Sequence, residues 1–85
     1  MGGVYLDTRK KVLSKLFLHR YIGGKHTEVR NILKGFPQDK HKEVEDLIKD
    51  LNNEGILFIY PKTNQMHCSL NPATLTSVKR ELGII

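Results

Sequence analysis

Hydrophobic residues in the first half of the chain recur at three- and four-residue spacing, which is the period of helices that bury one side. The pattern predicts helices over about residues 8–21, 27–34 and 39–53. A glycine able to adopt a left-handed backbone follows each segment and is expected to end it, at Gly23-Gly24, Gly35 and Gly55. The side chains expected on the core are Val12, Leu13, Leu16, Phe17, Tyr21, Val29, Ile32, Leu33, Val44, Leu47, Ile48 and Leu51.

Side chains that can cap a helix mark where two of these helices begin. Asp7 or Thr8 is the expected N-cap of the first helix, and Thr27 is that of the second. Between the second and third helices, Gly35-Phe36-Pro37 predicts a tight turn with Phe36 inserted into the core. Two helices joined by a short glycine-containing turn form the centre of a helix-turn-helix.

After Gly55 the pattern becomes that of strands. Residues 56–60 are rich in β-branched and aromatic side chains, and hydrophobic and polar side chains alternate along residues 66–70. Residues 61–65 have the composition of a turn, so the two segments predict an antiparallel hairpin. The residues expected to face inward from the second strand are Met66, Cys68 and Leu70.

A last helix is predicted after the hairpin, with Asn71 as its N-cap and Pro72 at its first position. Its hydrophobic side consists of Leu75, Val78 and Leu82. Residues 1–85 are expected to form a single domain of the α+β class. Three helices, a two-stranded antiparallel wing and a C-terminal helix, in that order, are the elements of a winged helix-turn-helix.

Charge is spread unevenly over a composition that is typical of a folded domain, with 39% hydrophobic and 27% charged residues. The net charge of +5 favours polyanionic partners. Residues 8–35 carry eight Lys or Arg and one acid, whereas residues 36–54 carry three Lys and six acids. The first two helices are therefore the expected source of phosphate contacts, and the third helix is acid-rich.

Several other classes of protein are not indicated. No apolar run reaches the ~20 residues of a membrane span, and the N-terminal residues lack the apolar core of a signal peptide. Cys68 is the only cysteine, which fits a reduced cytoplasm.

Neither a metal site nor catalysis is expected. His67 and Cys68 are adjacent in a strand and therefore point to opposite faces. The other histidines, which are His19, His26 and His41, show no paired ligand spacing. No cofactor is expected, and no glycine-rich phosphate loop, carboxylate pair or Ser, His and Asp grouping indicates an enzyme.

Four short stretches carry a resemblance to a known group of proteins. They are His26-Thr27, Lys34-Gly35-Phe36-Pro37, Asn53-Glu54-Gly55-Ile56-Leu57 and Ser69-Leu70-Asn71-Pro72. With these stretches, residues 8–82 resemble small archaeal winged-helix proteins. The resemblance implies a winged-helix fold and a cytoplasmic DNA-binding regulator of transcription, and it is an analogy at the level of fold.

The candidate contacts to double-stranded DNA fall into three groups. The third helix would be the recognition helix, with Gln38, Lys40, His41, Lys42 and Lys49 as its candidates. Its outward face, which also holds Glu45 and Asp46, is equally consistent with a salt-bridged surface. The basic surface before it comprises Arg20, Lys25, His26, Thr27, Arg30 and Lys34, and it would bind phosphates at a helix N-terminus. At the wing tip, Lys62 and Asn64 could touch DNA, although a plain hairpin turn explains them as well.

Two other kinds of partner stay open. The acidic third helix could meet a basic protein, which would make the chain a protein-interaction module. The basic helices could instead bind RNA or the ribosome. A homodimer through Leu75, Val78 and Leu82 of the last helix, extended by Ile84 and Ile85, is the expected oligomer, with packing on the first helix as the alternative.

Overall fold

The computed structural model describes the backbone of residues 2–62 and 64–85 and the side chains of residues 8–62 and 64–85. The fold is a small α+β domain, as the sequence predicts. Its helices are α1 (Gly2–Leu18), α2 (Val29–Leu33), α3 (His41–Asn53) and α4 (Leu75–Glu81), and its strands are β1 (Thr27–Glu28), β2 (Leu57–Lys62) and β3 (Gln65–Leu70). Two short 3-10 turns, Gln38–Lys40 and Pro72–Thr74, precede α3 and α4.

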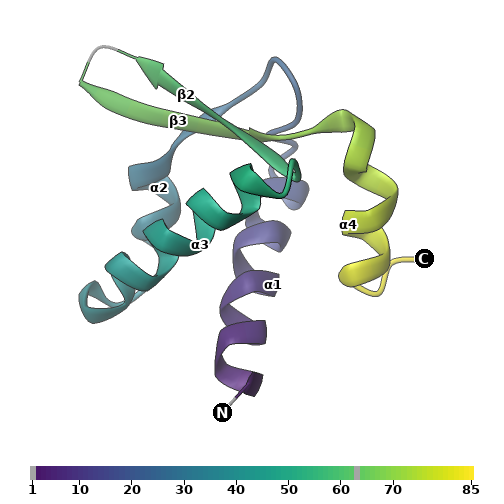
Figure 1. Ribbon diagram of the computed structural model, residues 1–85, viewed down its shortest axis with the longest axis horizontal. Coiled ribbons are helices and arrows are strands. Elements are labelled where there is room, and N and C mark those ends of the chain that lie inside the picture. The colour runs from purple at the N-terminus through teal and green to yellow at the C-terminus, as the bar shows by residue number, and fades with distance from the viewer. Residues whose placement is uncertain (1, 63) are drawn as a thin grey trace.

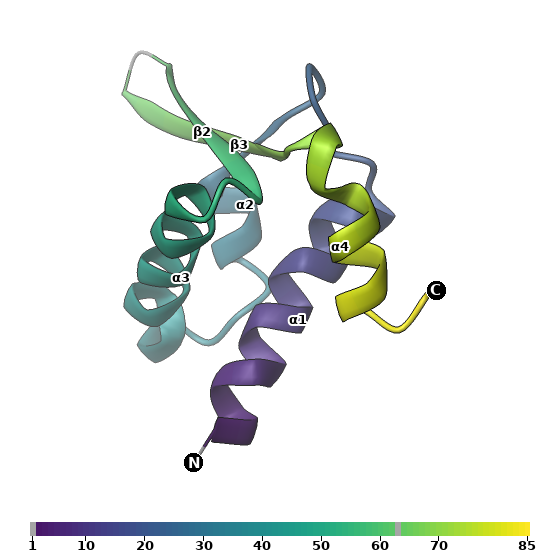
Figure 2. The same ribbon diagram turned by 45° about the vertical axis from the view of Figure 1, so that its right-hand side comes forward.

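The strands form one antiparallel sheet in the order β1-β3-β2. Figures 1 and 2 show the four helices on one side of this sheet, with α1 between α3 and α4. The other side of the sheet is left open to solvent over the β2–β3 hairpin, which projects beyond α3. Near its C-terminal end β3 also pairs with the α1–β1 loop, because the Leu70 N–H donates to the Tyr21 carbonyl and the Gly23 N–H to the Leu70 carbonyl, both at 2.9 Å.

The hydrophobic core lies between the sheet and the helices. Its buried residues are Val12, Leu13, Leu16, Ile32, Val44, Leu47, Ile48, Leu51, Leu57, Cys68, Leu70 and Val78. The predicted inward sides of all four helices are confirmed, and Phe36 packs against the core as expected. Met66 is the exception: it lies on the inward face of β3 but is 45% exposed, because it pairs with Pro61 near the tip of the hairpin, beyond the buried core.

The predicted start of the first helix is wrong. Helix α1 begins at Gly2, so Asp7 and Thr8 lie inside it and neither is an N-cap. Thr8 is tolerated there because its hydroxyl has a tertiary partner: Thr8 Oγ1 donates to the Glu43 carboxylate on α3 at 3.3 Å. Long-range contacts thus override a capping preference that acts only locally.

The predicted end of the first helix is wrong as well. Helix α1 stops at Leu18, and Arg20, not a glycine, adopts the left-handed conformation, with φ of 59°. The Tyr21 N–H donates to the Leu16 carbonyl and the Arg20 N–H to the Phe17 carbonyl, which is the Schellman pattern. Gly55 and Gly83 occupy the same left-handed position after α3 and α4. Helix α1 ends where Tyr21 turns toward the core and β3. The sequence pattern does not show this turn, because it depends on contacts with a distant strand.

Replacing Arg20 with glycine should therefore stabilise the protein. A left-handed conformation strains any residue with a Cβ, so we expect Arg20→Gly to raise the free energy of unfolding by about 0.5–1 kcal/mol. Urea denaturation followed by circular dichroism measures this change. Arg20→Ala is the matched control: it removes the same charge and keeps the Cβ, so a similar gain in both variants would contradict the backbone explanation.

Thr27 does not cap the second helix. Thr27 and Glu28 form β1 and pair with Cys68 and His67 of β3, so the sheet has three strands where the sequence predicts two. Helix α2 begins only at Val29, and Glu28 precedes it without a side-chain cap bond. Thr27 pairs with a strand that is distant in the sequence, and this long-range contact prevails over its local preference to cap a helix.

The remaining boundaries shift by a few residues. The 3-10 turn Gln38–Lys40 precedes the third helix, and both hairpin strands are longer than predicted, since β2 extends to Lys62 and β3 begins at Gln65. Thr63, in the predicted turn, lies outside the described residues. Asn71 is confirmed as a cap, since its side chain accepts from the Ala73 N–H at 3.0 Å, but the turn that it opens is a 3-10 turn.

Arg9 joins three helices. Its Nε donates to Glu81 on α4 at 2.6 Å, and its Nη1 to Glu54, which directly follows α3, at 3.2 Å. These hydrogen bonds, the one to Glu81 first, raise the pKa of Arg9 above its already high usual value. One member of the basic segment 8–35 thus holds the fold together and is not available to a partner.

The hydrophobic side of the last helix is used within the chain. Val78 is buried, and Leu75 and Leu82 are partly buried against the core. The three residues proposed from sequence for a homodimer therefore pack on the core of the chain, and Ile84 and Ile85 are exposed beyond them. Within the described residues, no helix combines the length and the apolar character needed to cross a bilayer.

Candidate nucleic-acid interface

Few of the basic side chains are neutralised by ion pairs. In the part of the chain that the structure describes, Arg9, Arg30 and Lys42 pair with carboxylates. The other lysines and arginines have no ion pair there, and Arg20, Lys25, Lys34 and Lys62 among the candidates are exposed. Most of the net positive charge is therefore free to meet a polyanion.

The α1–β1 loop presents three of the predicted residues. Arg20 and Lys25 are exposed, and Lys25 Nζ lies 6.0 Å from the centre of the Tyr21 ring. His26 is half-buried, and its Nδ1 lies 3.0 Å from Nδ1 of His67, so one ring must donate and the other accept. Partial burial, followed by the charges of Lys62 and His67, lowers the pKa of His26 and favours its neutral form.

Two of the residues predicted on the basic surface are not available. Thr27 is only 5% exposed, and its hydroxyl accepts a hydrogen bond from Asn31 Nδ2 at 3.2 Å. Arg30 is exposed but pairs with Glu28 at 2.9 Å. The expected phosphate site at the start of the second helix thus loses the side chains of Thr27 and Arg30. Lys34 at the end of α2 is exposed, as are Arg20 and Lys25 in the α1–β1 loop.

The third helix offers little net charge. Lys42 pairs with Asp46 at 3.9 Å, and Glu45 and Lys49 are both exposed on the same side of α3. His41 Nε2 lies 3.1 Å from the Phe36 carbonyl, which ties the ring to the turn before the helix. In the 3-10 turn before the helix Gln38 is exposed and Lys40 half-buried, and Lys49 on α3 is exposed without an ion pair in the described structure, so possible DNA contacts remain at both ends of this segment.

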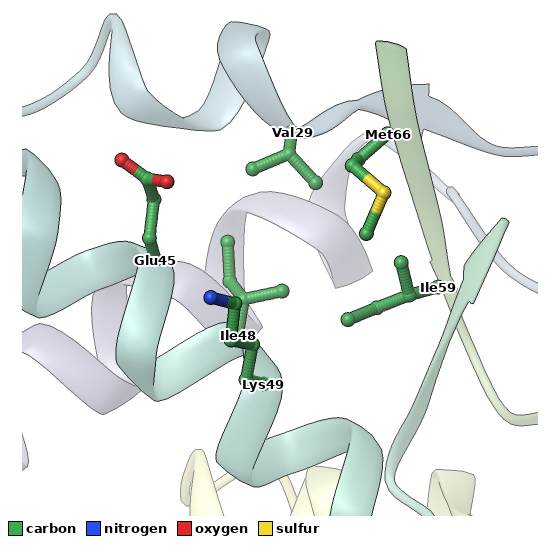
Figure 3. A pocket seen from close by; sticks show the side chains of 6 residues that line it. All are labelled: Val29, Glu45, Ile48, Lys49, Ile59 and Met66. Atoms are coloured by element: carbon green, nitrogen blue, oxygen red, sulfur yellow. The ribbon is translucent and has the colours of Figure 1, made fainter. Parts of the chain in front are cut away.

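A hollow separates α3 from the hairpin. Figure 3 shows Ile59 and Met66 pointing from the strands toward Ile48, with Val29 beside them and Glu45 and Lys49 at the edge. Its volume is about 50 Å³, far below the several hundred Å³ of a small-molecule site. The hollow is therefore a shallow apolar dent beside the predicted recognition helix.

At the hairpin tip, Lys62 and Gln65 are opposite one another across β2 and β3. Lys62 and Asn64 are exposed, as the sequence predicts for wing contacts. In Figures 1 and 2 this tip lies at the upper left and the first turn of α3 at the lower left, so that the hairpin and α3 diverge toward the same side of the molecule.

The open face of the sheet carries aromatic rings that sequence reasoning missed. Phe58 and Tyr60 on β2, with His67 on β3 and the adjoining His26, form a chain of ring contacts with centroids 4.9–6.4 Å apart. The signal was present in the alternation of residues 57–62, in which Phe58 and Tyr60 fall on the face opposite Leu57 and Ile59. The alternation alone did not show that the face with Phe58 and Tyr60 is open, because that depends on all the helices packing against the other face.

Metal binding and thiol chemistry find no support in the described residues, where no group of three potential ligands from His, Cys, Asp and Glu gathers. Burial raises the pKa of the Cys68 thiol to about 12, so the thiolate is scarce at neutral pH.

Comparison with protein-family models, curated proteins and solved structures finds no match.

Proposed function

We propose that this chain is a winged-helix protein that binds double-stranded DNA. The observation that supports the proposal best is the placement of the hairpin tip and the first turn of α3 on the same side of the molecule (Figures 1 and 2). A winged helix presents these two elements to DNA, the helix to the major groove and the wing to the flanking backbone. Unpaired lysines lie at both, Lys34 and Lys40 near the turn and Lys62 on the hairpin.

The proposed binding is dominated by phosphate contacts. The exposed side of α3 has little net charge, because Lys42 pairs with Asp46 and Glu45 lies beside Lys49. Phosphate contacts position a protein without reading sequence, so we expect weak sequence preference and strong salt dependence. The role as a small transcriptional regulator in an archaeal cytoplasm rests on the resemblance of the sequence. Of the residues proposed for a homodimer, Ile84 and Ile85 are the exposed ones.

The test is a fluorescence-anisotropy titration of random duplex DNA at several salt concentrations. Each neutralised phosphate contributes about 0.9 to the slope of log K against log salt. Replacing Lys34 and Lys40 with glutamine should therefore reduce that slope by ~1.8 and weaken binding.

Lys79→Gln with Arg80→Gln is the matched control, since both residues lie on α4, which Figures 1 and 2 show across α1 from α3, and the net charge falls equally. If DNA binding weakened equally in both double variants, the interaction would depend on net charge alone and not on this surface. Absence of duplex binding at low salt would overturn the proposal. Tighter binding to RNA than to duplex DNA would instead favour the RNA partner that the sequence leaves open. Binding to neither nucleic acid would favour a protein partner.

A further inference from the structure

The open face of the sheet is defined by cross-strand pairs that point away from the helices. Phe58 is opposite Ser69, Tyr60 is opposite His67, and Lys62 is opposite Gln65. Because residues directly opposite one another share a face, these side chains and the adjoining His26 lie together. Apart from the α1–β1 loop at one end, Figures 1 and 2 show no element of the chain over this side of the hairpin.

The rings on this face are held in place by hydrogen bonds beneath them. The Tyr60 hydroxyl hydrogen-bonds with Ser69 Oγ at 3.3 Å, and Ser69 Oγ in turn donates to the Gly23 carbonyl at 2.8 Å. His26 and His67 are joined through their Nδ1 atoms at 3.0 Å. Side chains fixed in this way lose little further conformational entropy when a ligand stacks on them.

The outermost ring is exposed. Phe58 is 39% exposed and meets Tyr60 edge to face, with centroids 6.4 Å apart. Phe58 does not belong to the core cluster, and its flat ring suits a planar partner.

Positive charge flanks the rings. Lys25 directly precedes His26, and Lys62 follows Tyr60 by two residues on the same face of β2. The acid that shares this face among the described residues is Glu28, opposite His67, and Arg30 neutralises it at 2.9 Å. The surface thus combines flat rings with lysines that have no ion pair and that lie one or two residues from the rings along the chain.

We propose that this open face, defined by His26, Phe58, Tyr60, Lys62 and His67 with Lys25 beside it, binds single-stranded nucleic acid. Unpaired bases stack on Phe58 and on the Tyr60–His26 pair, while Lys25 and Lys62 contact the backbone phosphates. Stacking requires bases that are not already sandwiched in a duplex, so the occupant is single-stranded. The site shares Lys62 with the proposed duplex contacts but otherwise lies on a different surface from Lys34, Lys40 and α3. The two proposals are therefore tested separately through Phe58 and through Lys34 with Lys40.

The experiment titrates a fluorescein-labelled twelve-nucleotide oligo(dT) with the full chain at low salt. Loss of one stacking ring in Phe58→Ala should weaken binding about 5- to 150-fold. Met66→Ala is the matched control, because Met66 is similarly exposed on the same hairpin but on its opposite face, and it should bind as the parent does.

A further pair of variants separates stacking from simple apolar burial. Phe58→Leu keeps the apolar bulk and should lose most of the affinity, whereas Phe58→Trp should keep or increase it. Circular dichroism checks that each variant is folded, and Phe58→Leu carries the test if Phe58→Ala does not fold. Lys25→Gln with Lys62→Gln should also lower the salt slope by ~1.4, the value expected for two phosphates of a single strand.

The outcomes separate this inference from the duplex proposal. Phe58→Ala should leave duplex binding unchanged, and Lys34→Gln with Lys40→Gln should leave oligo(dT) binding unchanged. Oligo(dT) affinity that is insensitive to Phe58, or absent at low salt, would overturn the inference whatever the duplex result. Loss of duplex binding alone would overturn only the proposed function.

Discussion

Truncating Leu51 to alanine should lower the free energy of unfolding by about 2–5 kcal/mol. Leu51 is fully buried in α3 within the core cluster, and its carbonyl also accepts the Ile56 N–H that closes the helix. The variant loses the transfer free energy of the deleted methyl groups and leaves a cavity that a rigid core fills only in part. A domain of this size has a total stability of roughly 4–13 kcal/mol, so a large fraction would be lost.

Leu18→Ala is the matched control for this prediction. Leu18 ends α1 and is 73% exposed, so the same deletion there should change stability by less than about 0.5 kcal/mol. Urea denaturation of both variants gives the comparison. Similar losses in the two would mean that α3 does not pack on the core as described.

Replacing Arg9 with alanine should destabilise the protein by about 1–3 kcal/mol. The variant removes hydrogen bonds to Glu81 and Glu54 and leaves two carboxylates beside one another at the junction of α1, α3 and α4. Both carboxylates are partly solvated, which keeps the effect below that of a fully buried pair. The loss should be smaller at high salt, because solvent-exposed charges are screened.

Lys10→Ala provides the control for Arg9. Lys10 is the exposed neighbour on the same helix, and its replacement changes the net charge equally. Thermal melts of the two variants at low and high salt should show a large, salt-sensitive effect for Arg9 and almost none for Lys10. A small effect for both would show that the three-helix junction does not depend on the ion pairs.

The candidate site could be predicted only in part from the sequence. Periodicity and charge placed Lys25, Lys34, Lys40 and Lys62 on the surface, and no described ion pair occupies them. The same reasoning could not foresee that Arg30 meets Glu28, or that Thr27 enters a strand. A residue's charge can be read from its type, but whether that charge is free depends on its neighbours in space.

The open face shows the same division. Alternation along residues 57–62 already placed Phe58 and Tyr60 opposite Leu57 and Ile59. Which of the two faces would be covered depended on where four helices packed, and His26 joined the rings only because its loop folds beside β3.

The sequence alone determined the α+β class, the buried sides of the helices and the existence of the hairpin, because these follow from the period of hydrophobic side chains within single elements. The tertiary structure alone decided the left-handed Arg20, the third strand at Thr27–Glu28, the Arg9 junction and the open aromatic face. Each of these depends on contacts between residues far apart in the chain, whose free energy outweighs local preferences of a kcal/mol or less.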